Sequence, residues 1–101
     1  MKNDRIELPR DVIAEVCRRW MIRELSLFGS ALRDDFRPDS DIDVLVVFDT
    51  AARWSLLDLV DLQRELGELL ERPVDLVEKS ALRNPFRRQS ILASRKVVYA
   101  A

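Results

Sequence analysis

Two acidic residues and a glycine–serine pair are the strongest candidates in this chain for a functional site. Asp41 and Asp43 stand two positions apart at the start of an apolar run, and ten residues separate them from Gly29-Ser30. Residues two apart in a β-strand point to the same side, about 7 Å from each other. Two carboxylates so placed repel unless a cation lies between them, and oxygen ligands favour magnesium or manganese. The pair therefore predicts a site for a hard divalent cation.

The Phe28-Gly29-Ser30 segment falls where a short strand is expected to run into a helix. Glycine lets the backbone approach a ligand closely, and the free N–H groups at a helix start attract phosphate. A Gly-Ser pair at such a junction is, however, most often only a turn and a helix cap. The segment on its own does not identify a phosphate site.

The residue types that are missing narrow the chemistry. The chain has no histidine and one cysteine, Cys17, which excludes a Ser-His-Asp triad, the common zinc sites and an internal disulfide. The P-loop pattern is absent. A haloacid-dehalogenase-like phosphatase places its acidic pair after the apolar strand, whereas here the pair precedes it. Carboxylates, hydroxyls, basic side chains and an oxygen-loving metal remain.

Length and composition limit the number of domains, the kinds of partner and the cellular location. The 101 residues fit one small domain, 1–101, and 17 basic residues nearly balance 18 acidic ones, so net charge suggests no nucleic-acid partner. No early apolar run resembles a signal peptide, and none is long enough to span a bilayer. With the single cysteine, these features favour a cytoplasmic protein without a membrane partner.

The hydrophobic pattern predicts an α+β fold: a small mixed β-sheet with helices packed mainly on one face. Asp41–Phe48 is the strongest strand, and its later half is apolar on both faces, which predicts a central strand covered on both sides. The expected helices are 9–20, 30–36, 54–70 and 85–94, and the expected strands are 25–28, 41–48, 74–78 and 95–100.

Three local signals refine the second half of the chain. Ser55 with Asp58 predicts a capping box, and Asn84 before Pro85 predicts a helix start. The helix over 54–70 is expected to bury one apolar face, formed by Leu56, Leu59, Val60, Leu66 and Leu70.

The spacing Gly-Ser-x10-Asp-x-Asp resembles the nucleotidyltransferase superfamily that shares the catalytic core of DNA polymerase β. Within it, the stretch FGSALRDDFRPDSDIDVLV, residues 28–46, is similar to the minimal nucleotidyltransferases of prokaryotic toxin–antitoxin pairs. The motif covers about a fifth of the chain, and the order of the predicted elements around it matches the family's.

The resemblance implies further site residues. It places a third metal-binding carboxylate at Asp75, which by itself reads as an outward polar residue of a strand, with Asp49 and Glu78 as the next candidates. It gives Arg33 a possible contact with the triphosphate, where an exposed helix arginine is the equal alternative. Family members often carry arginine at the position of Ala31 and glycine at that of Asp34, and these departures put turnover in doubt more than fold.

The activity that the resemblance implies is transfer of AMP from ATP to a hydroxyl. Two Mg²⁺ ions, or Mn²⁺, would be held by Asp41, Asp43 and Asp75, with Gly29 and Ser30 on the phosphates. The implied acceptor and partner is a HEPN-type toxin, modified on a tyrosine within a hetero-oligomer, which makes this chain the antitoxin. Two alternatives stay open: an antitoxin that neutralises by binding alone, and an antibiotic-type nucleotidyltransferase of small molecules.

Other conspicuous residues are interpreted as structural. Cys17, Trp20, Trp54 and Tyr99 are expected to pack in or beside the core. A basic set is interpreted as a solvated helix face or, alternatively, a partner contact; it comprises Arg83, Arg87, Arg88, Arg95 and Lys96.

Overall fold

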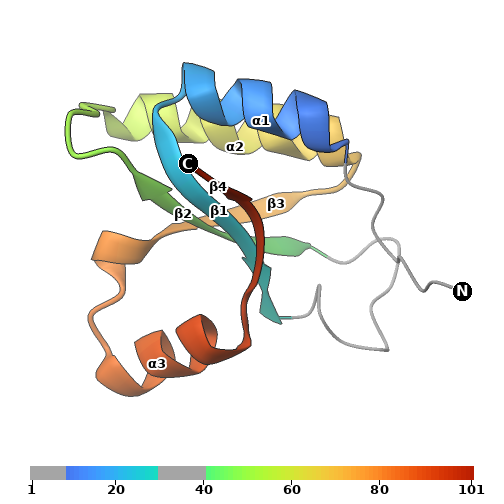
Figure 1. The fold of residues 1–101 in the computed structure, drawn as a ribbon. Helices are drawn as coiled ribbons and strands as arrows, with labels where there is room; N and C mark the ends of the chain where they lie inside the picture. The colour runs from blue at the N-terminus through green and yellow to red at the C-terminus, as the bar shows by residue number, and fades with distance from the viewer. Residues whose placement is uncertain (1–8, 30–40) are drawn as a thin grey trace, which may run out of the picture.

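A four-stranded mixed sheet forms the centre of the structure, a computed structural model that describes residues 9–29 and 41–101 (Figure 1). The strand order is β3-β2-β1-β4, with β2 and β3 parallel and the other two pairs antiparallel. The described elements run in chain order as α1 (Arg10–Arg19), β1 (Ile22–Phe28), β2 (Ile42–Phe48), α2 (Leu56–Leu70), β3 (Val74–Glu78), the 3₁₀ turn η2 (Lys79–Ala81), α3 (Pro85–Ser94) and β4 (Lys96–Ala100).

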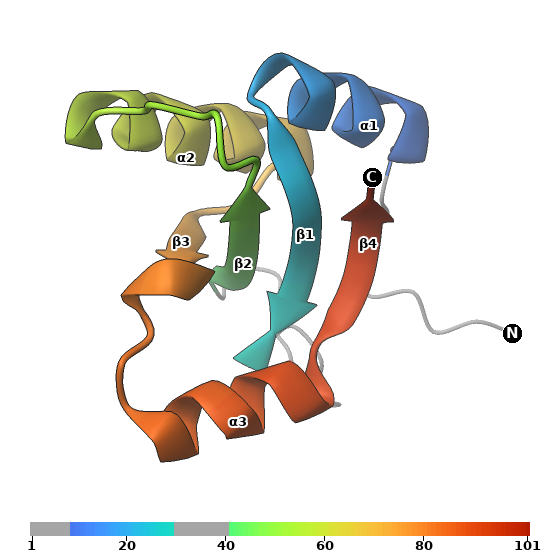
Figure 2. The same ribbon diagram turned by 60° about the vertical axis from the view of Figure 1, so that its left-hand side comes forward.

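Helices cover both faces of this sheet unequally. The helices α1 and α2 lie side by side on one face, and α3 lies on the other (Figures 1 and 2). The larger core fills the α1–α2 face and includes Ile42, Val44 and Val46 of β2. A smaller cluster fills the α3 face: Phe28, Leu45, Leu82 and Ile91. The expected α+β fold with a central strand covered on both sides is confirmed.

The cap residues of two helices behave as their sequences indicate. The Ser55 hydroxyl accepts a hydrogen bond from the Asp58 N–H, while the Asp58 carboxylate accepts one from the Ser55 N–H. The Asn84 side chain accepts bonds from the N–H groups of Phe86 and Arg87, with Pro85 at the first helical position. Because these groups satisfy otherwise unpaired helix N–H groups, they fix where α2 and α3 begin.

The buried face of α2 differs from the expected one. Leu62 and Leu66 are its buried residues, whereas Leu56 and Val60 are 78% and 53% exposed. The apolar positions of this helix are too many to share one face, so the pattern alone did not single out Leu62. The strand β1 is also longer than predicted, since it begins at Ile22 and pairs there with Phe48.

The remaining predictions about single residues are mostly confirmed. Cys17 is fully buried, and Tyr99 packs against the larger core. The rings of Trp20 and Trp54 contact each other at a tilt of 57°, with centroids 4.8 Å apart. The expected helix 30–36 and the loop after it lie outside the described residues. Within the described ranges, no helix has the length and apolar character needed to cross a membrane.

Candidate active site

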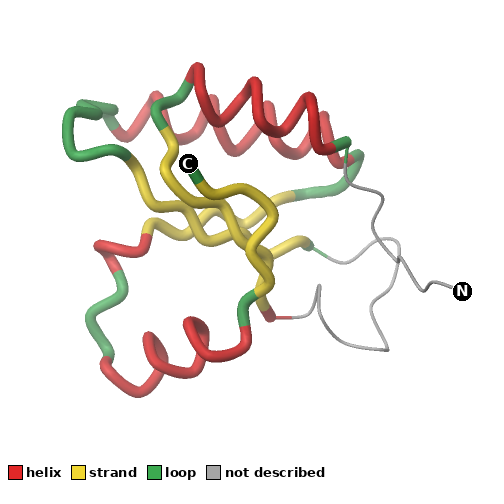
Figure 3. The backbone as a smooth tube through the Cα atoms, in the orientation of Figure 1, coloured by secondary structure: helices red, strands yellow, loops and turns green. Residues whose placement is uncertain are grey.

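The register of β1, β2 and β3 brings the predicted acidic residues to one end of the sheet. Figure 3 shows the strands of this sheet in yellow. Asp43 pairs with Phe28 of β1 on one side and with Asp75 of β3 on the other. Neighbouring strands are about 4.8 Å apart, so the backbones of Asp43 and Asp75 are direct neighbours. Asp41 precedes β2 by one residue, and the adjacent Ile42 N–H donates to the Pro73 carbonyl at 2.9 Å. This bond ties the start of β2 to the start of β3.

Strand alternation places these carboxylates on the α3 face of the sheet. The neighbours of Asp43, Ile42 and Val44, belong to the core under α1 and α2, so Asp43 points the other way. Val74 and Leu76, the neighbours of Asp75, also face the larger core, so Asp75 points to the α3 face as well. Its side chain is exposed, as expected. Asp43 is half-buried and Asp41 is exposed, so this end of the sheet is open to a ligand.

The alternative third carboxylates lie elsewhere. Asp49 follows the far end of β2, and Glu78 is the last residue of β3, paired with Val46. Both are therefore at the opposite end of the sheet from Asp43. Among the acidic residues considered for a third ligand, Asp75 alone is in register with Asp43.

Gly29 lies against the Asp43 carboxylate. Its φ of +67° belongs to the left-handed region, which side-chain-bearing residues rarely adopt. A Cβ atom at this position would overlap an oxygen of the Asp43 carboxylate and lie 3.2 Å from its carboxyl carbon. Position 29 therefore requires glycine for two reasons: its backbone conformation and the lack of space for a Cβ atom beside Asp43.

Ser30 and Arg33, with Ala31 and Asp34, lie outside the described residues. In the part of the chain that is described, no three acidic or sulfur side chains stand close enough together to hold one ion. The strand register does place the backbones of Asp43 and Asp75 side by side. All-oxygen donors of this kind fit Mg²⁺ or Mn²⁺.

One residue beside the site carried no signal in the sequence. The Gln63 side chain of α2 accepts a hydrogen bond of 3.0 Å from the Leu76 N–H. Leu76 lies next to Asp75 on β3, an edge strand, so this bond satisfies a backbone donor that would otherwise face solvent. A glutamine on a helix gives no indication from sequence that it reaches a strand edge.

The sequence matches the family model described as a nucleotidyltransferase domain over residues 9–98. The chain belongs to the nucleotidyltransferase domain family. The match spans α1 through β4 and so contains Gly29, Asp41, Asp43 and Asp75.

Curated relatives of this nucleotidyltransferase are named for transfer to proteins. It is 39% identical to the protein adenylyltransferase MntA of Thermococcus cleftensis, over 84% of this chain and 81% of the relative. It is 35% identical to a candidate protein adenylyltransferase of Methanocaldococcus jannaschii, over 84% and 85% of the two chains.

Solved structures share the fold of this nucleotidyltransferase. A candidate minimal nucleotidyltransferase superimposes with a TM-score of 0.69 at 34% identity, covering 85% of both chains. A chain of a toxin–antitoxin crystal structure with AMP-PNP gives a TM-score of 0.73 at 23% identity, covering 93% of this chain and 75% of that one. The expected nucleotidyltransferase fold and family are confirmed.

Proposed function

We propose that this nucleotidyltransferase transfers AMP from ATP to a tyrosine hydroxyl of a HEPN-type toxin, and that it is the antitoxin of that toxin. The observation that carries the proposal is the row formed by Gly29, Asp43 and Asp75 at one open end of the sheet. The relationship to the protein adenylyltransferase MntA supports a protein as acceptor. A solved structure of a tri-AMPylated HEPN toxin of Shewanella oneidensis in complex with an MNT antitoxin includes a chain of the same fold, which superimposes on this one with a TM-score of 0.63.

The reaction forms one bond and breaks one. The acceptor hydroxyl oxygen attacks the α-phosphorus of ATP, the bond from that phosphorus to the α–β bridging oxygen breaks, and pyrophosphate leaves. In this proposal Asp75 takes the proton of the attacking hydroxyl, because it is the carboxylate in register with Asp43 and is exposed to an incoming acceptor. The Gly29 backbone and Ser30 hold the distal phosphates.

The three aspartates fit a divalent metal, and Asp41, Asp43 and Asp75 are the residues that would hold two Mg²⁺ ions. Bound there, such ions supply neutralisation of phosphate charge and a lower pKa of the acceptor hydroxyl. The chain itself must then orient the acceptor hydroxyl relative to the α-phosphate of ATP. Exposure of Asp41 and Asp75 leaves room for a side chain that is presented by a second protein.

Intact-mass spectrometry of the toxin tests the proposal. A HEPN-type toxin from the same genome is incubated with ATP, Mg²⁺ and the wild-type chain or the Asp43→Asn variant, which is nearly isosteric. Wild type is expected to add AMP and silence the toxin; the variant should fold and bind but leave the toxin unmodified and active. Full neutralisation by both proteins without an adduct would instead establish an antitoxin that acts by binding alone.

A further inference from the structure

The basic residues of this protein are unevenly distributed. Six of its 17 basic residues and none of its 18 acidic residues lie within 79–96, so the other 83 residues hold 11 basic and 18 acidic side chains. The basic segment comprises η2, the loop 82–84, α3, Arg95 and the first residue of β4. The near-zero net charge is therefore the sum of a basic segment, 79–96, and an acidic remainder of the chain.

One of these cations has a structural role, which corrects its interpretation as part of a solvated face. Arg95 Nε donates to Glu24 Oε2 at 2.8 Å and Arg95 Nη1 to the Leu92 carbonyl at 2.7 Å, and the Arg95 side chain is 24% exposed. This pair fastens the end of α3 to β1. Arg83, Arg87 and Arg88, in contrast, are exposed and make no ion pair with the described residues.

The position of these arginines works against the helix that carries them. Arg87 and Arg88 are the third and fourth residues of α3, and its first turn contains no acidic residue. The N-terminus of a helix has partial positive charge and favours acidic side chains. Local stability therefore does not explain the two cations, and an anionic surface brought by a partner would.

Apolar surface accompanies this charge. Phe86, between the arginines, is 86% exposed, the largest exposure among the large hydrophobic residues described. One side of α3 presents an open, mostly apolar surface, formed by Pro85, Arg88, Gln89, Leu92 and Ala93. Exposed aromatic and arginine side chains are the residues that protein interfaces favour.

The α3 surface is also placed on the correct side of the sheet. It lies on the face that bears Asp43 and Asp75 (Figure 2). Its C-terminal end leads into β4, whose Lys96 pairs with Leu27, and Arg88 and Arg87 lie six and seven residues before that end, about 9–11 Å along the helix axis. A macromolecule that presents its hydroxyl to Asp75 can contact α3 at the same time.

We infer that Arg83, Phe86, Arg87 and Arg88 form the docking surface for the acceptor protein, whose matching surface is acidic and carries an apolar side chain that contacts Phe86. The inference rests on the proposed function, because it assigns the surface to the partner that is modified. Charge complementarity of this kind fixes orientation and speeds association.

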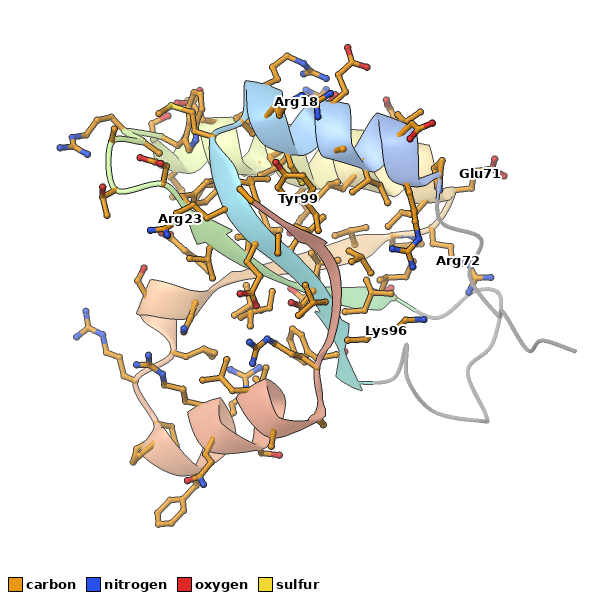
Figure 4. The ribbon with its side chains drawn as sticks, viewed as in Figure 1. Arg18, Arg23, Glu71, Arg72, Lys96 and Tyr99 are labelled. Carbon is orange, nitrogen blue, oxygen red and sulfur yellow. The ribbon has the colours of Figure 1, made fainter. Side chains whose placement is uncertain are left out.

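Charge reversal with a matched control tests this docking surface. The triple variant Arg83→Glu, Arg87→Glu, Arg88→Glu is compared with Arg10→Glu, Arg18→Glu, Arg23→Glu, which changes net charge equally; Figure 4 labels Arg18 on α1, which covers the opposite face. Affinity for the purified HEPN-type toxin is measured by calorimetry at low and high salt, and AMP transfer by intact mass. A Phe86→Ser variant probes the apolar contact.

The α3 reversal should weaken toxin binding at least ~10-fold and remove most of its salt dependence, while the control binds as wild type. The α3 reversal should also raise the melting temperature, because it places acidic side chains at the start of the helix. A raised melting temperature would exclude unfolding as the cause of weaker binding. Phe86→Ser should weaken binding without changing its salt dependence.

The outcomes separate this inference from the proposed function. AMP transfer with equal binding by both triple variants overturns the docking surface and leaves the function standing. Binding that depends on α3 without any AMP transfer supports the surface and removes the catalytic proposal. A wild-type chain that does not bind the toxin overturns both. Tight binding of a single-stranded RNA that only the α3 reversal abolishes, with toxin binding unchanged, assigns the surface to nucleic acid and overturns the inference.

Discussion

A close approach between the Gly29 backbone and the Asp43 carboxylate links the two sequence motifs of the site. The sequence could identify both motifs but not this contact, because it depends on the antiparallel register that pairs Phe28 with Asp43. The contact gives Gly29 a reason to be glycine that is independent of any ligand.

Gly29→Ala is expected to damage both fold and site. An alanine at φ +67° costs about 1–2 kcal/mol, and its Cβ would displace the Asp43 carboxylate. The free energy of unfolding should fall by at least that amount, and ATP affinity in Mg²⁺ should fall with it, as measured by thermal melts and calorimetry. The same change at Gly67, in α2, should retain ATP binding. Wild-type affinity in Gly29→Ala would show that the junction has no part in nucleotide binding.

Asp75→Asn separates a chemical role from a structural one. We expect the rate of adduct formation to drop at least ~100-fold, the usual scale for acid–base groups. Nucleotide affinity should change far less, and the melting temperature should stay or rise, because one of three neighbouring negative charges is removed.

Glu78→Gln provides the matched control for Asp75→Asn, since Glu78 is on the same strand but at the other end of the sheet. Its rate should equal that of wild type. An Asp75→Asn protein that loses stability and keeps its rate would make Asp75 an ordinary strand residue.

At the scale of elements, one polar cluster joins α1 to α2. Arg19 donates to both carboxylate oxygens of Glu65, at 3.2 and 2.6 Å, and Trp20 Nε1 donates to Glu65 Oε1 at 2.9 Å. The indole N–H of Trp54 donates to the Trp20 carbonyl at 2.8 Å, which adds the segment before α2 to the cluster. These bonds hold the two helices over the larger core.

The cluster predicts a pH-dependent contribution to stability. The hydrogen bond from Arg19 lowers the pKa of Glu65, and the Trp20 N–H acts in the same direction. A carboxyl group whose pKa is lower in the folded state stabilises the fold above its unfolded pKa, near 4.3, and this contribution is lost as pH falls through the folded value.

Glu65→Gln should therefore lower the melting temperature at pH 7, and the difference from wild type should shrink below about pH 4. Asp61→Asn, which breaks the exposed Asp61–Arg64 pair, should have a smaller effect at every pH. Thermal melts from pH 3 to 7 measure both variants. A Glu65→Gln deficit that does not change with pH would show that packing, and not charge, accounts for the loss.

Sequence patterns predicted elements well where the physical signal is local. The capping residues Ser55 and Asn84 mark helix starts through bonds within one turn, and the apolar run of β2 requires burial on both faces. Arg95 was misassigned because its ion-pair partner, Glu24, is 71 positions away in the sequence. Leu62 was missed because α2 offers several apolar faces and the sequence does not say which one is buried. Such choices are made by tertiary packing.

At the scale of the whole molecule, Cys17 reports on the integrity of the larger core. The residue is fully buried, and burial raises the pKa of its thiol to about 12, against a small opposing effect of Arg18. The thiolate is the reactive form, so the folded protein should react with a thiol reagent at pH 8 only as fast as the core opens. Urea should restore rapid reaction. Prompt, stoichiometric labelling of the native protein would contradict the burial of Cys17.

At the scale of the whole molecule, the proposed catalytic site and the proposed docking surface lie on the same face of the sheet. One end of the sheet holds the aspartates, and α3, on the same face, offers cations and an exposed aromatic ring. The arrangement lets one macromolecular partner contact both at once. Neither the near-zero net charge nor any single motif indicates it, because it emerges from the path of the chain from β3 through α3 to β4.

Transfer of label from ATP to the toxin distinguishes nucleotidyl transfer at this site from other reactions of ATP. With Mg²⁺ and a HEPN-type toxin from the same genome, label in the α-phosphate should appear on the toxin, and label in the γ-phosphate should not. Excess EDTA or the Asp43→Asn substitution should abolish the transfer. Transfer of the γ label, or α-label transfer at the wild-type rate by Asp43→Asn, would contradict nucleotidyl transfer at this row of aspartates.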